Sequence, residues 1–81
     1  MTPQDRIACV KGAVQVLIDN AWDPSIAFQV CNAVRSDLTE PCFAMSNWYL
    51  NAVYAKSEDD LVLYCDQFGG PRQAMCRSNL P

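Results

Sequence analysis

A nearly uninterrupted apolar stretch occupies residues 42–55, with the sequence CFAMSNWYLNAVYA. Only Ser46, Asn47 and Asn51 interrupt it. Its length of about four helical turns favours an α-helix, although Trp, Tyr and Val also have strand propensity. A helix with so few polar positions is usually buried at the centre of a domain. We therefore expect a central helix over about residues 42–56, against which the rest of the chain packs.

The two sides of this helix differ in composition. At about 100° per residue, one side collects Ala44, Met45, Trp48, Tyr49, Ala52 and Ala55. We expect this side, with Trp48, to face the core. The opposite side mixes aromatic and apolar anchors with amides that can hydrogen-bond, which is typical of a recognition surface. The sequence thus predicts a partner-binding face made of Phe43, Asn47, Leu50, Asn51 and Tyr54. The alternative is that neighbouring helices cover this face.

The start of the chain carries a complete pattern for beginning a helix. Thr2 stands at an N-cap position, Pro3 follows at the first helical position, and Asp5 occupies the acidic position of a capping box. Apolar residues then recur at helical spacing to about Asn20. We expect a first amphipathic helix over this range.

A second helix is predicted to begin at Asp23 and Pro24, an N-cap residue followed by proline, and to end near Arg35. Trp22 stands just before the N-cap, where it can pack on the first turn of this helix. We therefore expect Trp22 in the core. Turn formers follow, and Pro41 suits the first turn of the central helix.

Ser57 and Asp60 form a second capping-box pattern. Apolar residues at helical spacing follow as far as Phe68, and Gly69 with Gly70 is predicted to end this helix. The side chains of the acidic run at its start point in different directions, so they do not predict a metal or acid-base site. Their negative charges suit the positive end of the helix dipole.

These patterns together predict an all-α fold, a small single-domain bundle over residues 1–81 with four or five short helices around the central one. Residues 71–80 supply the fifth helix or remain a loosely attached tail. A chain of this length buries only about 60 to 65% of the surface that it exposes when unfolded, so its core must be dense.

The charges are sparse, with nine acidic and six basic side chains and a formal net charge of -3. The basic residues are scattered singly. Because phosphate binding needs clustered Lys and Arg, direct contact with nucleic acid, including helix-turn-helix binding of DNA, is the least favoured function. No apolar run approaches the about 20 residues needed to cross a bilayer, and the N-terminus has no basic region followed by an apolar block. We expect no membrane insertion and a cytoplasmic location.

The five cysteines, an odd number without a CxxC pair, leave two alternatives open. With no histidine and no close cysteine spacing, a metal site is not expected. We expect reduced, buried thiols, because Cys9, Cys31 and Cys65 fall on apolar helix faces. The alternative is a secreted or periplasmic domain in which four of the five cysteines form two disulfides and one stays unpaired. The two cysteines not yet named are Cys42 and Cys76.

The sequence lacks the usual parts of an active site. Without histidine, the commonest general base is missing, and none of the three glycines belongs to a phosphate-binding loop. We expect no catalytic residues, no cofactor and no enzyme activity.

The first functional prediction is a non-enzymatic protein-binding module, namely a small inhibitor or adaptor of a larger protein or protein complex. Whether the module also forms a homodimer is left open. In size, acidity and lack of a catalytic constellation the chain is similar to small inhibitors encoded by phages and mobile elements, including anti-CRISPR proteins. This similarity concerns class alone, and it carries over no residues. The alternative is a secreted, disulfide-stapled helical effector, toxin or immunity protein.

Overall fold

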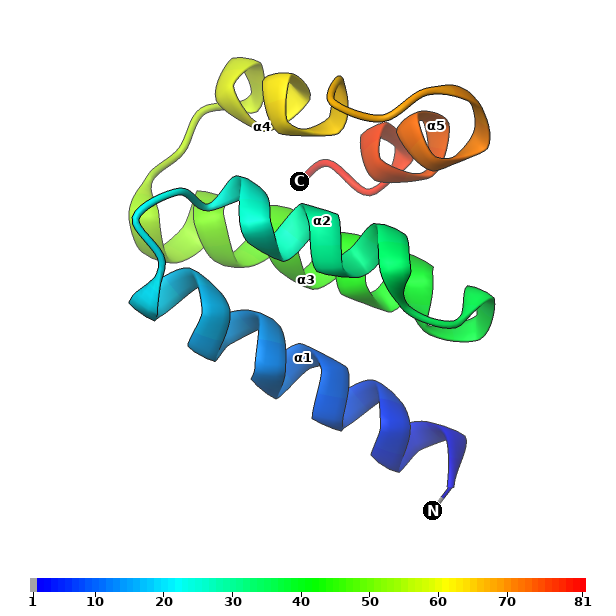
Figure 1. The fold of residues 1–81 in the computed structure, drawn as a ribbon. Helices are drawn as coiled ribbons and strands as arrows, with labels where there is room; N and C mark the ends of the chain where they lie inside the picture. Colours follow the sequence, from blue (N-terminus) through cyan, green and yellow to red (C-terminus); the bar gives the residue numbers. More distant parts are fainter. Residues whose placement is uncertain (1) are drawn as a thin grey trace.

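A computed structural model describes residues 2–81 of the chain, which form five α-helices and no strand (Figure 1). The prediction of an all-α bundle is confirmed, and the C-terminal segment forms a helix. The central position of the long apolar helix is confirmed as well, because α3 contacts each of the other four helices. The helices are α1 Pro3–Asn20, α2 Ser25–Ala33, α3 Ser36–Tyr54, α4 Glu58–Cys65 and α5 Gly70–Ser78.

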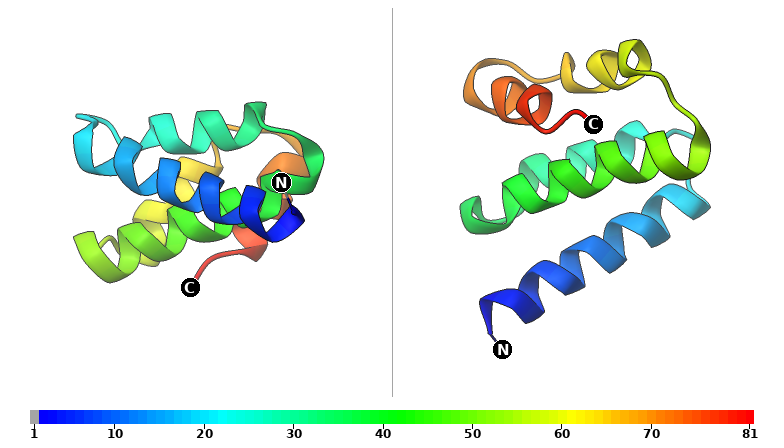
Figure 2. Two further views of the ribbon diagram at one scale, coloured as in Figure 1. Left: turned by 90° about the horizontal axis from the view of Figure 1, so that it is seen from below. Right: turned by 180° about the vertical axis from the view of Figure 1, so that it is seen from behind.

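Three helices form one half of the molecule and two short helices cover it. α1, α2 and α3 pack against one another, and α4 with α5 lies across α2 and α3 on the side away from α1 (Figures 1 and 2). α1 is therefore an outer helix with one packed side, whereas α3 contacts all four of the other helices and still keeps one side partly exposed. This difference leaves a groove beside α1, described below.

Both predicted capping boxes are present. Thr2 Oγ1 accepts a hydrogen bond of 3.1 Å from the Asp5 N–H, and the Asp5 carboxylate accepts one of 3.2 Å from the Thr2 N–H. Ser57 and Asp60 make the same pair of bonds at 3.3 and 3.4 Å at the start of α4. Each box satisfies two N–H groups that a helix start would otherwise leave without partners.

α3 is longer than its apolar stretch. It begins at Ser36, so Pro41 lies inside the helix rather than in its first turn. Pro41 has no N–H to donate to the Asp37 carbonyl, so one hydrogen bond of the helix is missing. The missing bond costs little because Asp37 is exposed to water. The helix ends at Tyr54, where Ala55 takes a left-handed conformation with φ of 55°.

Two helix ends differ from the predictions. α4 ends at Cys65, before Phe68, and a turn follows in which the Phe68 N–H donates to the Cys65 carbonyl at 3.2 Å. Gly69 and Gly70 do not cap α4; they begin α5, with Gly69 as its N-cap and Gly70 at φ of 61°. The left-handed conformation of Gly70 lets the chain reverse between the two helices without steric cost. α2 also ends earlier than predicted, at Ala33.

Trp22 does not belong to the core, and the prediction that it does is wrong. Its side chain is fully exposed in the connection between α1 and α2. The prediction of Asp23 as the N-cap of α2 is wrong as well, because the helix begins at Ser25 and Pro24 is its N-cap, without a side-chain capping bond. The Asp23 carboxylate accepts a hydrogen bond of 3.0 Å from the Ser25 N–H just before the helix. Phe28, the large apolar residue near the start of α2, packs on α3 and α4 and leaves Trp22 without the expected contact.

Aromatic rings tie the core together across three helices. The ring of Phe28 in α2 stacks on Tyr64 in α4 at a centroid distance of 5.2 Å and lies 6.4 Å from Phe43 in α3. Phe43 in turn meets Phe68 edge-on at 5.7 Å. The buried apolar residues around them are Val14, Ile18, Ala27, Cys31, Cys42, Leu50, Leu61, Cys65 and Cys76.

Two disulfides join neighbouring helices. Cys31 and Cys42 link α2 to α3 with a Cα–Cα distance of 5.3 Å, and Cys65 and Cys76 link α4 to α5 at 5.5 Å. Cys9, on α1, is the remaining cysteine, and it is an exposed thiol. The expectation of reduced, buried thiols is therefore wrong, and the two disulfides with one unpaired cysteine agree with the alternative, which did not specify which cysteines pair.

Candidate functional site

The described residues contain no cluster suited to metal binding. Within residues 2–81, no group of three or more His, Cys, Asp or Glu side chains could hold a metal ion. Over the same residues, none of the helices combines the length and the apolar character that crossing a bilayer requires. The surface must therefore be judged by its shape, its exposed apolar groups and its charges.

The predicted partner-binding face of α3 is largely covered. Phe43, Asn47 and Leu50 are fully buried, so for these three residues the alternative of a covered face holds. The physical reason is that neighbouring elements cover this side: Phe28 of α2 and Phe68 pack on Phe43, and α5 contacts Asn47. Asn47 connects α3 to α5 inside the core, because its Nδ2 donates a hydrogen bond of 3.1 Å to the Cys76 carbonyl in α5.

The other two residues of that face, Asn51 and Tyr54, are exposed. Asn51 Nδ2 donates a hydrogen bond of 3.0 Å to the Lys56 carbonyl, which completes the end of α3. Tyr54 donates to Asp19 in α1. A partner-binding role for these two side chains stays a prediction.

The exposed side of α3 is the one that was expected to face the core. Trp48 is 53% exposed, and Ala52 and Ala55 are exposed as well. α1 covers part of this side, where Met45 and Tyr49 are half-buried. The prediction that the side of α3 with Trp48 faces the core is therefore wrong.

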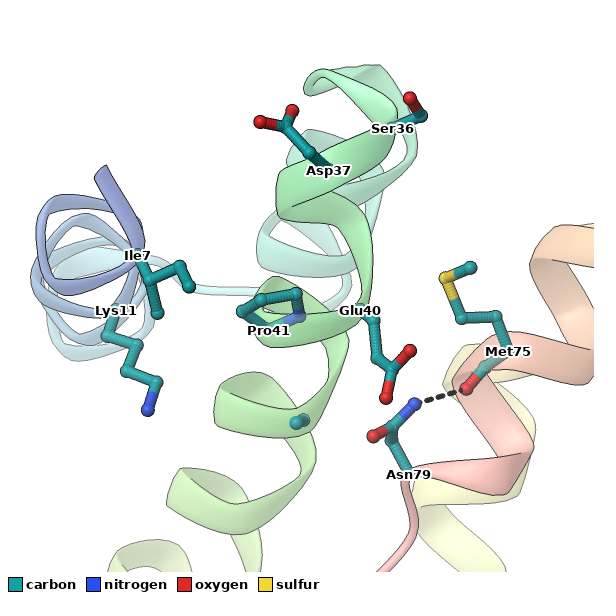
Figure 3. A pocket seen from close by; sticks show the side chains of 9 residues that line it. Ile7, Lys11, Ser36, Asp37, Glu40, Pro41, Met75 and Asn79 are labelled. Atoms are coloured by element: carbon teal, nitrogen blue, oxygen red, sulfur yellow. Dashed lines mark hydrogen bonds between the residues drawn. The ribbon is translucent and has the colours of Figure 1, made fainter. Parts of the chain in front are cut away.

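A surface hollow of about 600 Å³ lies along the exposed side of α3, between α1 and α5 (Figure 3). Pro41 and Ala44 of α3 form its floor, and their small side chains leave the space open. Ile7 and Lys11 of α1 stand on one side. Met75 of α5 and Asn79, the C-cap of that helix, stand on the other, where Asn79 Nδ2 donates a hydrogen bond of 2.8 Å to the Met75 carbonyl. Ser36, Asp37 and Glu40 complete the lining.

A second hollow, of about 350 Å³, continues the first. It is lined by Lys11, Ala44, Met45 and Trp48, and it shares Lys11 and Ala44 with its neighbour. The two together form one channel on the surface, which we call the α3 groove. Its floor follows α3 from Asp37 to Trp48, and its volume falls within the range of ligand-binding clefts.

Aromatic side chains extend the surface beyond the groove, towards the end of α3. The Trp48 ring lies 6.5 Å from Tyr49, and Tyr49 meets Tyr54 edge-on at 5.8 Å. The Tyr49 hydroxyl donates to both carboxylate oxygens of Asp19 at 2.9 Å. This cluster fixes the C-terminal end of α1 against α3 and so holds one wall of the groove in place.

The Asp19 carboxylate changes the acidity of both phenols. The hydrogen bond to Asp19, with smaller contributions from burial and from the negative charge of Asp19, raises the pKa of Tyr54 to about 12. The same causes raise the pKa of Tyr49. Both tyrosines therefore remain neutral donors at neutral pH, and neither has the lowered pKa that would suit a catalytic base.

The spacing of the cysteines carries a signal for their pairing. Both disulfides span a sequence separation of 11, so the same spacing recurs in two consecutive helix pairs. A separation of this size fits the end of one helix, a short turn and about two turns of the next helix. Equal spacings in an otherwise irregular set of cysteines indicate pairing.

Comparison with models of protein families, with curated proteins and with solved structures finds no match to this chain. The geometry of the α3 groove and the disulfides must carry the functional argument.

Proposed function

We propose that this chain is a non-enzymatic protein-binding module whose α3 groove holds a segment of a partner protein. The observation that carries this proposal is the half-exposed Trp48 at one end of a groove with an apolar floor. Tryptophan is enriched among the residues that contribute most to protein–protein binding, and an exposed indole beside a hollow offers a partner a large apolar contact.

The disulfides support a location outside the cytoplasm. Disulfides form and persist in oxidising compartments and are rare where glutathione and thioredoxin keep thiols reduced. All four paired cysteines are buried, which suits a permanent structural role. Of the two classes that the sequence left open, the stapled module of a secreted or periplasmic location is therefore the better supported. A role there as inhibitor, effector, toxin or immunity protein stays a prediction.

Photo-crosslinking tests the groove directly. p-Benzoylphenylalanine replaces Trp48 in one variant and, as a matched control, Leu63 in another, since Leu63 is a large exposed apolar residue on α4 that lines neither hollow. The variants are irradiated with secreted or periplasmic extract of the source organism. We expect an adduct from position 48 that position 63 does not give.

A blocking variant completes the experiment. Ala44→Arg places a long side chain on the floor that the two hollows share and should abolish the adduct from position 48. Equal adducts from both positions, or an adduct that persists with Ala44→Arg, would contradict binding in the α3 groove.

A further inference from the structure

The α3 groove holds two charged side chains that are not neutralised by any residue in the described part of the chain. Lys11 projects from α1 and Glu40 from α3, on opposite sides of Pro41 (Figure 3). Among residues 2–81, neither makes a salt bridge. Asp37 differs, because it pairs with Arg35 at 3.3 Å. The groove thus presents a positive charge on its α1 side and a negative charge beside Asn79 of α5.

The shape of the groove favours a helix as its occupant. An extended segment would bring backbone N–H and C=O groups onto the apolar floor without partners, whereas a helix satisfies these groups itself. The lining residues Asp37, Pro41, Ala44 and Trp48 of α3 recur at helical spacing over about 16 Å, which matches three turns of a second helix. The small side chains of Pro41 and Ala44 let the backbone of that helix approach closely.

We infer the chemistry of the partner from these charges and this shape. The inference rests on the protein-binding function proposed above. The groove takes an amphipathic helix whose apolar stripe is flanked by an acidic side chain on one side and a basic side chain on the other. The acid faces Lys11 and the base faces Glu40. The arrangement is that of flanking charges in a coiled coil, which select partners by complementarity.

Displayed peptide libraries test the inference without knowledge of the natural partner. Three libraries of helical peptides share the same randomised apolar stripe and differ in their flanks, which are acidic and basic, basic on both sides, or acidic on both sides. A helix can enter the groove in either direction, so exchanging the two flanks would be uninformative, whereas giving both flanks the same charge is decisive.

The wild-type protein should bind the mixed library in preference to each of the other two. Each attractive charge pair that a uniform library replaces by two like charges should weaken binding by about two- to fivefold. The Lys11→Glu variant makes both sides of the groove acidic and should transfer the preference to the library with basic flanks. High salt should reduce both preferences, because the charges are exposed to solvent. Circular dichroism checks that the variant remains folded.

The two proposals fail in different ways. Equal binding of all three libraries by the wild type, with binding still lost in Ala44→Arg, would overturn the inferred charge pattern and leave the groove as a binding site. Binding of no library, or binding that Ala44→Arg does not affect, would overturn the groove itself and the proposed function with it.

Discussion

The hydroxyl of Tyr54 donates a hydrogen bond to the carboxylate of Asp19, which lies 35 positions earlier in the chain. This bond connects the last residue of α3 to the last turn of α1. α1 carries one wall of the α3 groove and neither disulfide reaches α1, so this wall is held on the rest of the protein by the buried side chains of α1, such as Val14 and Ile18, and by the hydrogen bonds to Asp19.

Replacing Asp19 with asparagine should lower the pKa of Tyr54 from about 12 towards the ordinary value of 10.0, because the carboxylate that accepts its proton is removed. The folded pKa of Tyr54 lies above the unfolded one, so the contact stabilises the fold below pH 10 and loses this contribution as the pH rises towards 12. Phenolate absorbance measured against pH gives the pKa. A Tyr54→Phe variant identifies the transition, and an unchanged titration in Asp19→Asn would contradict the contact.

Thiol titration should find one reactive cysteine in the protein isolated without reducing agent, both folded and in denaturant. That cysteine is Cys9, which is exposed on α1. The other four are disulfide-bonded, so all five react only after reduction. A Cys9→Ser variant should give no reaction before reduction. Five reactive thiols in denaturant alone would contradict both disulfides and remove the support for an oxidising compartment.

Removing either disulfide should lower the free energy of unfolding by about 3 kcal/mol, the value expected for closing a loop of this length in the unfolded chain. The double variants Cys31→Ala with Cys42→Ala and Cys65→Ala with Cys76→Ala test the two bonds separately, and their equal sequence separations predict similar losses. Urea unfolding followed by circular dichroism measures the change. A loss below about 1 kcal/mol in either variant would show that the bond does not constrain the unfolded state.

The two sides of α3 can be distinguished by a pair of substitutions. Trp48→Ala should cost only about 1 kcal/mol, because the ring is half-exposed, whereas Phe43→Ala should cost about 3 to 5 kcal/mol. Leu50→Asp should prevent folding, since Leu50 is fully buried and would place a charge without a partner in the core. Urea unfolding gives the first two values, and circular dichroism shows whether Leu50→Asp folds. A Trp48→Ala loss equal to that of Phe43→Ala would mean that the ring is buried.

The sequence predicted the helices well wherever local chemistry decides the structure. Thr2 and Ser57 cap helices because their hydroxyls reach an N–H three residues ahead, which depends on no distant contact. The end of α4 was less predictable. The apolar spacing continues to Phe68, but that residue reaches the core through a turn, where it meets Phe43.

The choice of side on α3 depends on tertiary packing, and periodicity alone could not supply it. Both sides are apolar enough to be buried, and the outcome depends on where α4 and α5 pack. Trp48 and Leu50 exchange their expected places for this reason. The α3 groove was similarly beyond reach, since Lys11, Ala44 and Met75 come from three helices and meet only in the folded chain.

The disulfides also decide how the protein would respond to proteolysis. A cut between Cys31 and Cys42, or between Cys65 and Cys76, leaves the two fragments covalently joined. A cut beside the exposed Trp22 is different, because it leaves α1 attached by packing and side-chain bonds alone. If α1 then dissociates, Ile7 and Lys11 leave with it, and one cleavage removes a wall of the groove while both stapled helix pairs stay intact.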